Sequence, residues 1–231
     1  MIPLRDEIRS RKRPYVVYVI IGLNVAVYLI ELLLYLSSKG AFRDFIFSFG
    51  LVPQRLFFET SWLDIGTILS SMFLHDAPSP VHVGANMLFL WVFGDNIEDA
   101  MGHWLFIPFY LVCGVAGALL HAVTVPHSPV VLIGASGAIS GVLGAYIILY
   151  PRSKVLSLVI LFFIRLIYIP SWVFIGIWFG YQLLYGLLTL GNSGGGVAFL
   201  AHVGGFLTGL IIALIFRKRL LRNTQPEIFF S

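Results

Sequence analysis

Charged residues are scarce in this chain of 231 residues, of which 11% are Asp, Glu, Lys or Arg and 58% are hydrophobic. A soluble domain of average composition carries about 25% charged residues. The shortage excludes an ordinary soluble globular protein, a disordered chain and a nucleic-acid-binding domain. Cysteine is nearly absent too: Cys113 is the single one, which excludes an internal disulfide framework and a thiolate metal site.

Long apolar runs take the place of the missing charge. A membrane-spanning helix needs about 20 residues, and the sequence predicts six spans, over about residues 15–36, 82–93, 104–125, 136–150, 171–189 and 197–216. The polar stretch 94–99 completes the second of them. The predicted fold is an all-α membrane protein. It has a basic segment over residues 1–14, a six-span domain over 15–216 and a tail over 217–231.

Two connections between the predicted spans are long enough to have a structure of their own. Residues 37–64 mix charged residues with aromatic pairs, so we expect an interfacial loop with short helices between the first and second spans. Residues 65–74 are apolar but too short to span. Residues 155–169 are rich in β-branched side chains and carry Arg165, and we expect a partly embedded connection.

The basic residues are distributed unevenly between the two sides of the predicted bundle. Six spans place both termini on one side, and twelve of the 15 Lys and Arg residues fall there. The other three are Lys39, Arg43 and Arg55. Cytoplasmic loops carry an excess of Lys and Arg, so we expect both termini to be cytoplasmic.

Polar residues inside apolar spans are candidates for function, because they are costly in a membrane interior. The string Gly134-Ala135-Ser136-Gly137 opens the fourth span, His202 lies in the sixth, and His82 and Asn86 lie one helical turn apart at the start of the second. A Gly-x-Ser-Gly string is weak evidence alone. Three further histidines are expected to be structural. His103 lies in the predicted turn over residues 94–103, His121 lies near the outer end of the third span, and His127 lies in the connection that follows it.

Topology makes the combination stronger than its parts. The second, fourth and sixth spans run in the same direction, so all these polar residues fall at the outer ends of parallel helices. The fourth span has 15 residues and a length of about 22 Å, against a hydrocarbon core of about 30 Å. Ser136 would therefore lie below the outer surface, at the floor of a water-filled cavity lined by residues 126–135.

Small residues at helical spacing predict a close contact between the fourth and sixth spans: Gly137 and Gly141 on one, Gly205 and Gly209 on the other. The contact would bring the Ser136 hydroxyl within reach of the His202 ring, as nucleophile and general base. Neither span offers a carboxylate to orient His202, so a dyad is predicted rather than a triad. No metal or cofactor is expected.

The tetrahedral intermediate of such a reaction needs donors aimed at its oxyanion. The candidates are the Asn86 amide, the His82 ring and the Ser136 backbone N–H. The N-terminal end of the fourth span adds a partial positive charge.

These residues resemble the rhomboid intramembrane serine proteases over nearly the whole chain. Residues 134–141 are similar to the family's Gly-x-Ser-Gly-x-x-x-Gly, residues 201–209 to its Ala-His-x-x-Gly-x-x-x-Gly, and residues 82–86 to its His-x-x-x-Asn. The resemblance implies that Ser136 is the nucleophile and His202 the base, with His82 and Asn86 in the oxyanion hole.

The resemblance also implies cleavage of single-span membrane proteins in or near their transmembrane segment, within a membrane whose lipids surround the protease. We expect a prokaryotic plasma (inner) membrane. Glu98 matches a structural carboxylate of the family. Three features depart from the family's pattern. The Trp-Arg pair often found in the first long loop is absent, and Phe42-Arg43 is the nearest string. Ser140 replaces a frequent aromatic residue, and the segment between His75 and His82 is about two residues longer.

Access to the predicted site is a separate hypothesis. Residues 191–196 should form a flexible loop over its outer mouth. The fifth span, with Trp172, Trp178 and Gln182, would move sideways to admit a substrate helix.

Two alternatives to a protease remain. A non-catalytic rhomboid-like protein would bind membrane clients, but such relatives usually lack the Ser or the His. A small transporter would show inverted repeats and charged residues deep in the bundle. The sequence shows neither; Glu31 is the one carboxylate within a span.

Overall fold

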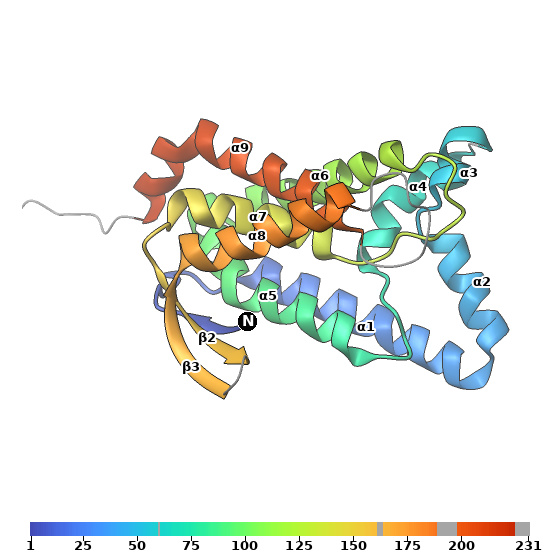
Figure 1. Ribbon diagram of the computed structural model, residues 1–231, viewed down its shortest axis with the longest axis horizontal. Helices are drawn as coiled ribbons and strands as arrows, with labels where there is room; N and C mark the ends of the chain where they lie inside the picture. Colours follow the sequence, from blue (N-terminus) through green and yellow to red (C-terminus); the bar gives the residue numbers. More distant parts are fainter. Residues whose placement is uncertain (60, 161–163, 189–197, 225–231) are drawn as a thin grey trace, which may run out of the picture.

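The computed structural model describes residues 1–59, 61–160, 164–188 and 198–224. Within them, six long helices pack into one bundle: α1 (Tyr15–Ser37), α5 (Pro80–Met101), α6 (His103–Thr124), α7 (Ser136–Leu149), α8 (Ser171–Leu188) and α9 (Phe199–Thr224). Short helices lie at one end of the bundle, here called the loop end, and a small sheet lies at the other, the sheet end (Figure 1).

The protein is a multi-pass membrane protein by the length and composition of its helices. Among the described residues, four helices are long and apolar enough to cross a membrane: α1, α6, α8 and the Phe199–Arg222 part of α9. Helix α7 is apolar but has only 14 residues. Helix α5 is less apolar, because its last turns carry Asp95, Glu98 and Asp99.

Helix α7 forms the centre of the bundle, packed against α9, α6 and α5. Eleven of its 14 residues are buried. A Cβ atom on Gly205 would lie 1.9 Å from the carbonyl oxygen of Gly137, and one on Gly209 would lie 2.0 Å from that of Gly141. Glycine is therefore required where α9 crosses α7, because the two backbones touch directly.

Short helices fill the segment between α1 and α5: α2 (Lys39–Phe49), α3 (Pro53–Phe58), α4 (Trp62–Ser70) and the 3-10 turn η1 (Ser71–Phe73). Helix α4 begins with a capping box, in which Ser61 and Asp64 each accept the other's backbone N–H. That these short helices lie at a membrane interface stays a prediction.

A three-stranded antiparallel sheet closes the sheet end: β1 (Ile2–Asp6), β2 (Lys154–Ile160) and β3 (Ile164–Pro170), in that order. The chain is therefore mostly helical rather than all-α. Strands β2 and β3 pair where a partly embedded connection was expected over residues 155–169. Helix α7 ends before Pro151, which cannot continue it. The β-branched and aromatic residues that follow favour a strand.

Two further boundaries differ from the sequence prediction. Helix α5 continues to Met101 and only Gly102, with φ +80°, separates it from α6. The acidic residues of 95–99 are thus helical, and His103 begins α6 instead of lying in a connection. Helix α9 continues to Thr224, so the basic residues after 216 extend the helix; Arg, Lys and Leu are good helix formers. The loop expected over residues 191–196 lies outside the described residues.

Candidate active site

Ser136 is the first residue of α7, and its position is set by the strand-like segment that precedes it. Leu132 exchanges two backbone hydrogen bonds with Leu51, and the backbone N–H of Gly134 donates to the carbonyl oxygen of Ser71. Gly134 has φ +121°, a conformation that favours glycine. The chain is thereby pinned to the loop-end helices just before the turn that presents the Ser136 hydroxyl.

His202 lies in the first turns of α9 and is 8% exposed. Its Nε2 atom lies 2.8 Å from the Ser136 Oγ atom. The glycine contacts between α7 and α9 allow this distance, because a side chain at Gly205 would push the two helices apart. A serine hydroxyl bonded to an imidazole nitrogen is the arrangement of an activated nucleophile and its base.

Helix α8 contributes two more groups to the surroundings of His202. The Gln182 Oε1 atom lies 2.8 Å from the Nδ1 atom of His202. The centroid of the Trp178 ring lies 6.0 Å from the centroid of the imidazole ring. Ser140, which stands where the resemblance would put an aromatic residue, donates its hydroxyl to the backbone oxygen of Ser136. The aromatic neighbour of His202 thus comes from α8 instead of α7.

Two of the expected oxyanion donors, His82 and Asn86, lie in the first turns of α5. A Cβ atom on Gly134 would lie 3.0 Å from His82 Nε2 and 3.6 Å from Ser136 Oγ, so the His82 ring and the serine hydroxyl flank the same glycine. The Asn86 Nδ2 atom lies 3.0 Å from the Nε2 atom of His75. An amide nitrogen carries two N–H groups, which leaves one for a reacting carbonyl.

The structure joins two residues to this site that sequence reasoning did not include. His75 is fully buried, bonds Asn86, and packs its ring against His82 with centroids 4.9 Å apart. Its backbone N–H donates to both carboxylate oxygens of Glu31, at 3.0 and 3.1 Å. The signal available in the sequence was Glu31 itself, since a carboxylate within an apolar span is a functional or structural anchor by default.

Glu98 lies far from this site, at the sheet end. Its carboxylate accepts the backbone N–H groups of Val16 and Val17, in the first turn of α1, at 3.0 and 2.8 Å, and contacts the ring of His103. A carboxylate at a helix N-terminus satisfies free N–H groups and complements the helix dipole. Glu98 therefore joins α5 to α1 and takes no part in the serine site.

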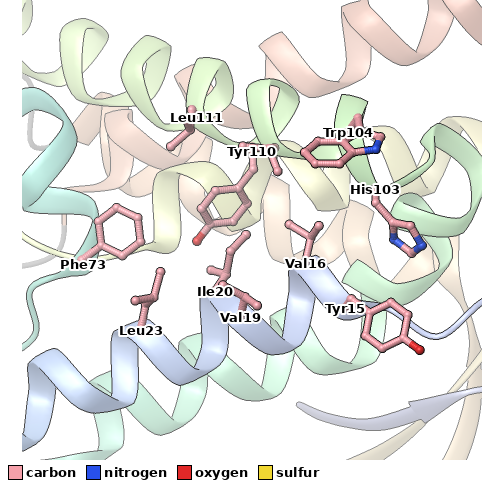
Figure 2. Close-up of a pocket in the computed structure, with 11 residues that line it drawn as sticks. Tyr15, Val16, Val19, Ile20, Leu23, Phe73, His103, Trp104, Tyr110 and Leu111 are labelled. Atoms are coloured by element: carbon pink, nitrogen blue, oxygen red, sulfur yellow. The ribbon is translucent and has the colours of Figure 1, made fainter.

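A separate apolar cavity of about 400 Å³ lies between α1 and α6. Figure 2 shows the Ile20 and Val16 side chains of α1 facing Tyr110 and Leu111 of α6 across it. None of the serine-site residues lines it. Among the described residues, no group of three or more His, Cys, Asp or Glu side chains is arranged to hold a metal ion.

Comparison with known proteins connects the chain to one family. The family model described as "Rhomboid domain" matches residues 63–219, more than half of the chain. That stretch contains Ser136, His202, His82 and Asn86.

Three relatives share moderate sequence identity with the chain. "Rhomboid protein 1, mitochondrial" of Saccharomyces cerevisiae is 26% identical over 218 residues, which are 92% of this chain and 56% of that protein. "Rhomboid protease GluP" of Bacillus subtilis is 28% identical over 203 residues, 87% of this chain and 34% of that protein. "RHOMBOID-like protein 6, mitochondrial" of Arabidopsis thaliana is 29% identical over 148 residues, which are 64% of this chain and 42% of that protein. The chain thus spans only part of each relative's length.

Proposed function

Because this chain belongs to the rhomboid family, we propose that it is an intramembrane serine endopeptidase that cleaves single-span membrane proteins in or near their transmembrane segment. The observation that carries the proposal is the contact of 2.8 Å between Ser136 Oγ and His202 Nε2. The name of one relative, a rhomboid protease, supports the same activity.

The proposed reaction has two stages. His202 Nε2 takes the proton of the Ser136 hydroxyl as Oγ attacks the scissile carbonyl carbon, and the same proton then passes to the leaving amine nitrogen as the peptide bond breaks. Water, activated by His202, hydrolyses the acyl-enzyme ester and returns the proton to Ser136. The Asn86 amide, the His82 ring and the Ser136 backbone N–H would donate to the oxyanion.

The proposed membrane arrangement adds α5 and α7 to the four apolar helices, which makes six crossings. Both termini would lie on the cytoplasmic side, because twelve of the 15 Lys and Arg residues fall on the sheet end of this arrangement. A prokaryotic plasma membrane was expected, but two of the three relatives named above are mitochondrial and do not support that choice. Reporter fusions at the two termini test the orientation.

Substrate entry between α5 and α8 is part of the proposal. Side chains fill the seam between these helices, with the Phe89 ring 6.5 Å from Trp178 and 6.1 Å from Phe174. An outward movement of α8 would open this seam to a helix from the membrane. A crosslink that pins α8 to α5 should block cleavage of membrane substrates, and undiminished cleavage would contradict this route.

The deciding experiment is reconstitution in liposomes with a labelled single-span substrate. Wild type should cleave it and react with a serine-directed fluorophosphonate, whereas Ser136→Ala should do neither and His202→Ala should lose labelling. Ser37→Ala, at the exposed end of α1, and His127→Ala, in the loop after α6, are the matched controls and should behave as wild type. Cleavage that survives Ser136→Ala would overturn the dyad, and absence of cleavage and labelling in wild type would favour a client-binding protein.

A further inference from the structure

Both ring nitrogens of His202 are occupied by polar side chains. Nε2 contacts Ser136, and Nδ1 lies 2.8 Å from the Oε1 atom of Gln182. His202 is 8% exposed and Gln182 is 6% exposed. The second contact is therefore shielded from solvent, where a hydrogen bond is stronger than in water and an unpaired polar group is costly.

Gln182 is conspicuous within its own helix. Helix α8 is built from large apolar and aromatic residues, and Gln182 is the one side chain in Ser171–Leu188 that carries an amide or a charge. An amide buried in such surroundings costs free energy unless it is hydrogen-bonded. Its contact with His202 accounts for the presence of a glutamine at this position.

The chemistry of the two groups fixes the direction of the hydrogen bond. The Oε1 atom of a glutamine can only accept, so the proton lies on Nδ1 of a neutral His202. The ring then has its lone pair on Nε2, facing Ser136. This is the tautomer that can take the serine proton, because the hydrogen bond at one ring nitrogen decides the state of the other.

Trp178 lies one helical turn before Gln182, on the same face of α8. Its ring packs against the imidazole with centroids 6.0 Å apart and also contacts Phe206 of α9. One face of α8 thus presents both an aromatic ring and a hydrogen-bond acceptor to His202.

We propose that Gln182 is the positioning residue of the Ser136–His202 dyad, a neutral counterpart of the orienting carboxylate in a serine triad. This inference rests on the proposed protease function. A neutral amide orients the base without placing a fixed charge in the membrane interior, where a charge is expensive. Because Gln182 is carried by α8, an outward movement of this helix would also release His202.

The test compares variants that remove or keep the accepting oxygen. Gln182→Leu should lower kcat by at least about tenfold while KM for the single-span substrate stays near the wild-type value. Gln182→Glu, which keeps an oxygen acceptor, should recover most of that loss. Gln54→Leu in α3 removes a glutamine elsewhere and should leave both parameters unchanged. A wild-type kcat in Gln182→Leu would overturn the proposal.

Nitrogen NMR of histidine-labelled protein reads the tautomer directly and does not require turnover. The His202 signal of wild type should report a protonated Nδ1, and Gln182→Leu should shift it towards a mixture of tautomers. An unchanged tautomer in Gln182→Leu would overturn the positioning role even if kcat falls. If wild type neither cleaves nor reacts with the fluorophosphonate, the proposed function fails, and the NMR comparison still tests the Gln182 contact alone.

Discussion

The two ends of the helical bundle use polar residues in different ways. At the sheet end, the carboxylates of Glu98 and Asp99 accept backbone N–H groups from the chain entering α1. At the loop end, the proposed catalytic and positioning side chains are one hydroxyl, two imidazoles and two amides, none of which carries a fixed charge. Charge is thus concentrated where helices begin and end, and neutral hydrogen bonds are used where groups are enclosed by apolar helices.

Glu31 is the instructive exception at the loop end. It is fully buried in α1, and both of its oxygens accept the backbone N–H of His75. His75 in turn bonds Asn86. The Glu31 carboxylate thus lies two contacts away from the proposed oxyanion donor Asn86, where it anchors a loop and stays outside the reaction.

The largest expected difference between the ends concerns their histidines. His202→Ala should lower kcat/KM on the order of a thousandfold, because it removes the general base. His103→Ala, which removes the contact with Glu98, should keep catalysis close to wild type and lower the unfolding temperature. Cleavage assays and thermal unfolding of both variants measure this, and equal losses of activity in the two would contradict the division between the ends.

A pair of asparagines offers a second, smaller contrast. Asn86→Ala should lower kcat about a hundredfold through the loss of an oxyanion donor. Asn96→Ala removes a donor to Asp6 and Asp95 at the sheet end and should lower stability instead. Single-turnover kinetics separate the two outcomes; a normal kcat in Asn86→Ala would remove this residue from the oxyanion hole.

The contact between α7 and α9 holds the loop-end site together, and glycine substitutions can weaken it. Gly205→Ala places a Cβ atom 1.9 Å from the Gly137 carbonyl oxygen and should lower the free energy of unfolding by about 1–3 kcal/mol, with slower fluorophosphonate labelling. Gly22→Ala in α1 meets nothing within 4 Å and should be neutral or slightly stabilising. Chemical denaturation in detergent checks both, and a tolerated Gly205→Ala would argue against close backbone contact.

A pH dependence is also expected at the sheet end. Burial raises the pKa of the Asp6 carboxyl from 3.8 to about 7, where it accepts hydrogen bonds from Tyr146 and Asn96. Because the pKa is higher in the folded state, the stabilisation is complete below pH 3.8 and is lost as pH rises through about 7. Hydrogen exchange of the β1 amides should speed up over this range after correction for the intrinsic rate, and Asp6→Asn should reduce the change.

Local patterns in the sequence were sufficient to predict the six long helices, apart from the C-terminal ends of α5 and α9, and to select the two residues of the proposed dyad. The apolar runs placed α1, α6 and α8 to within a residue or two, because a membrane-spanning helix satisfies its own backbone and needs only a long enough apolar segment. Ser136 and His202 could be paired from topology and glycine spacing. These features depend on residues close together in the chain, or on the simple alternation of helix direction.

Contacts between side chains of different helices were decided by the tertiary structure alone. The pairing of Gln182 with His202 depends on how α8 and α9 are rotated about their axes, which sequence spacing does not specify. The pairing of His75 with Asn86 depends on how the loop between η1 and α5 folds against α5. The sheet depends on Ile2–Asp6 pairing with a strand about 150 residues later. By itself, the sequence determined a low-charge membrane bundle with a serine and a histidine at the same end. The packing of α7, α8 and α9 decided which groups surround that histidine, because close-packed helices fix each side chain's neighbours only when all are in place.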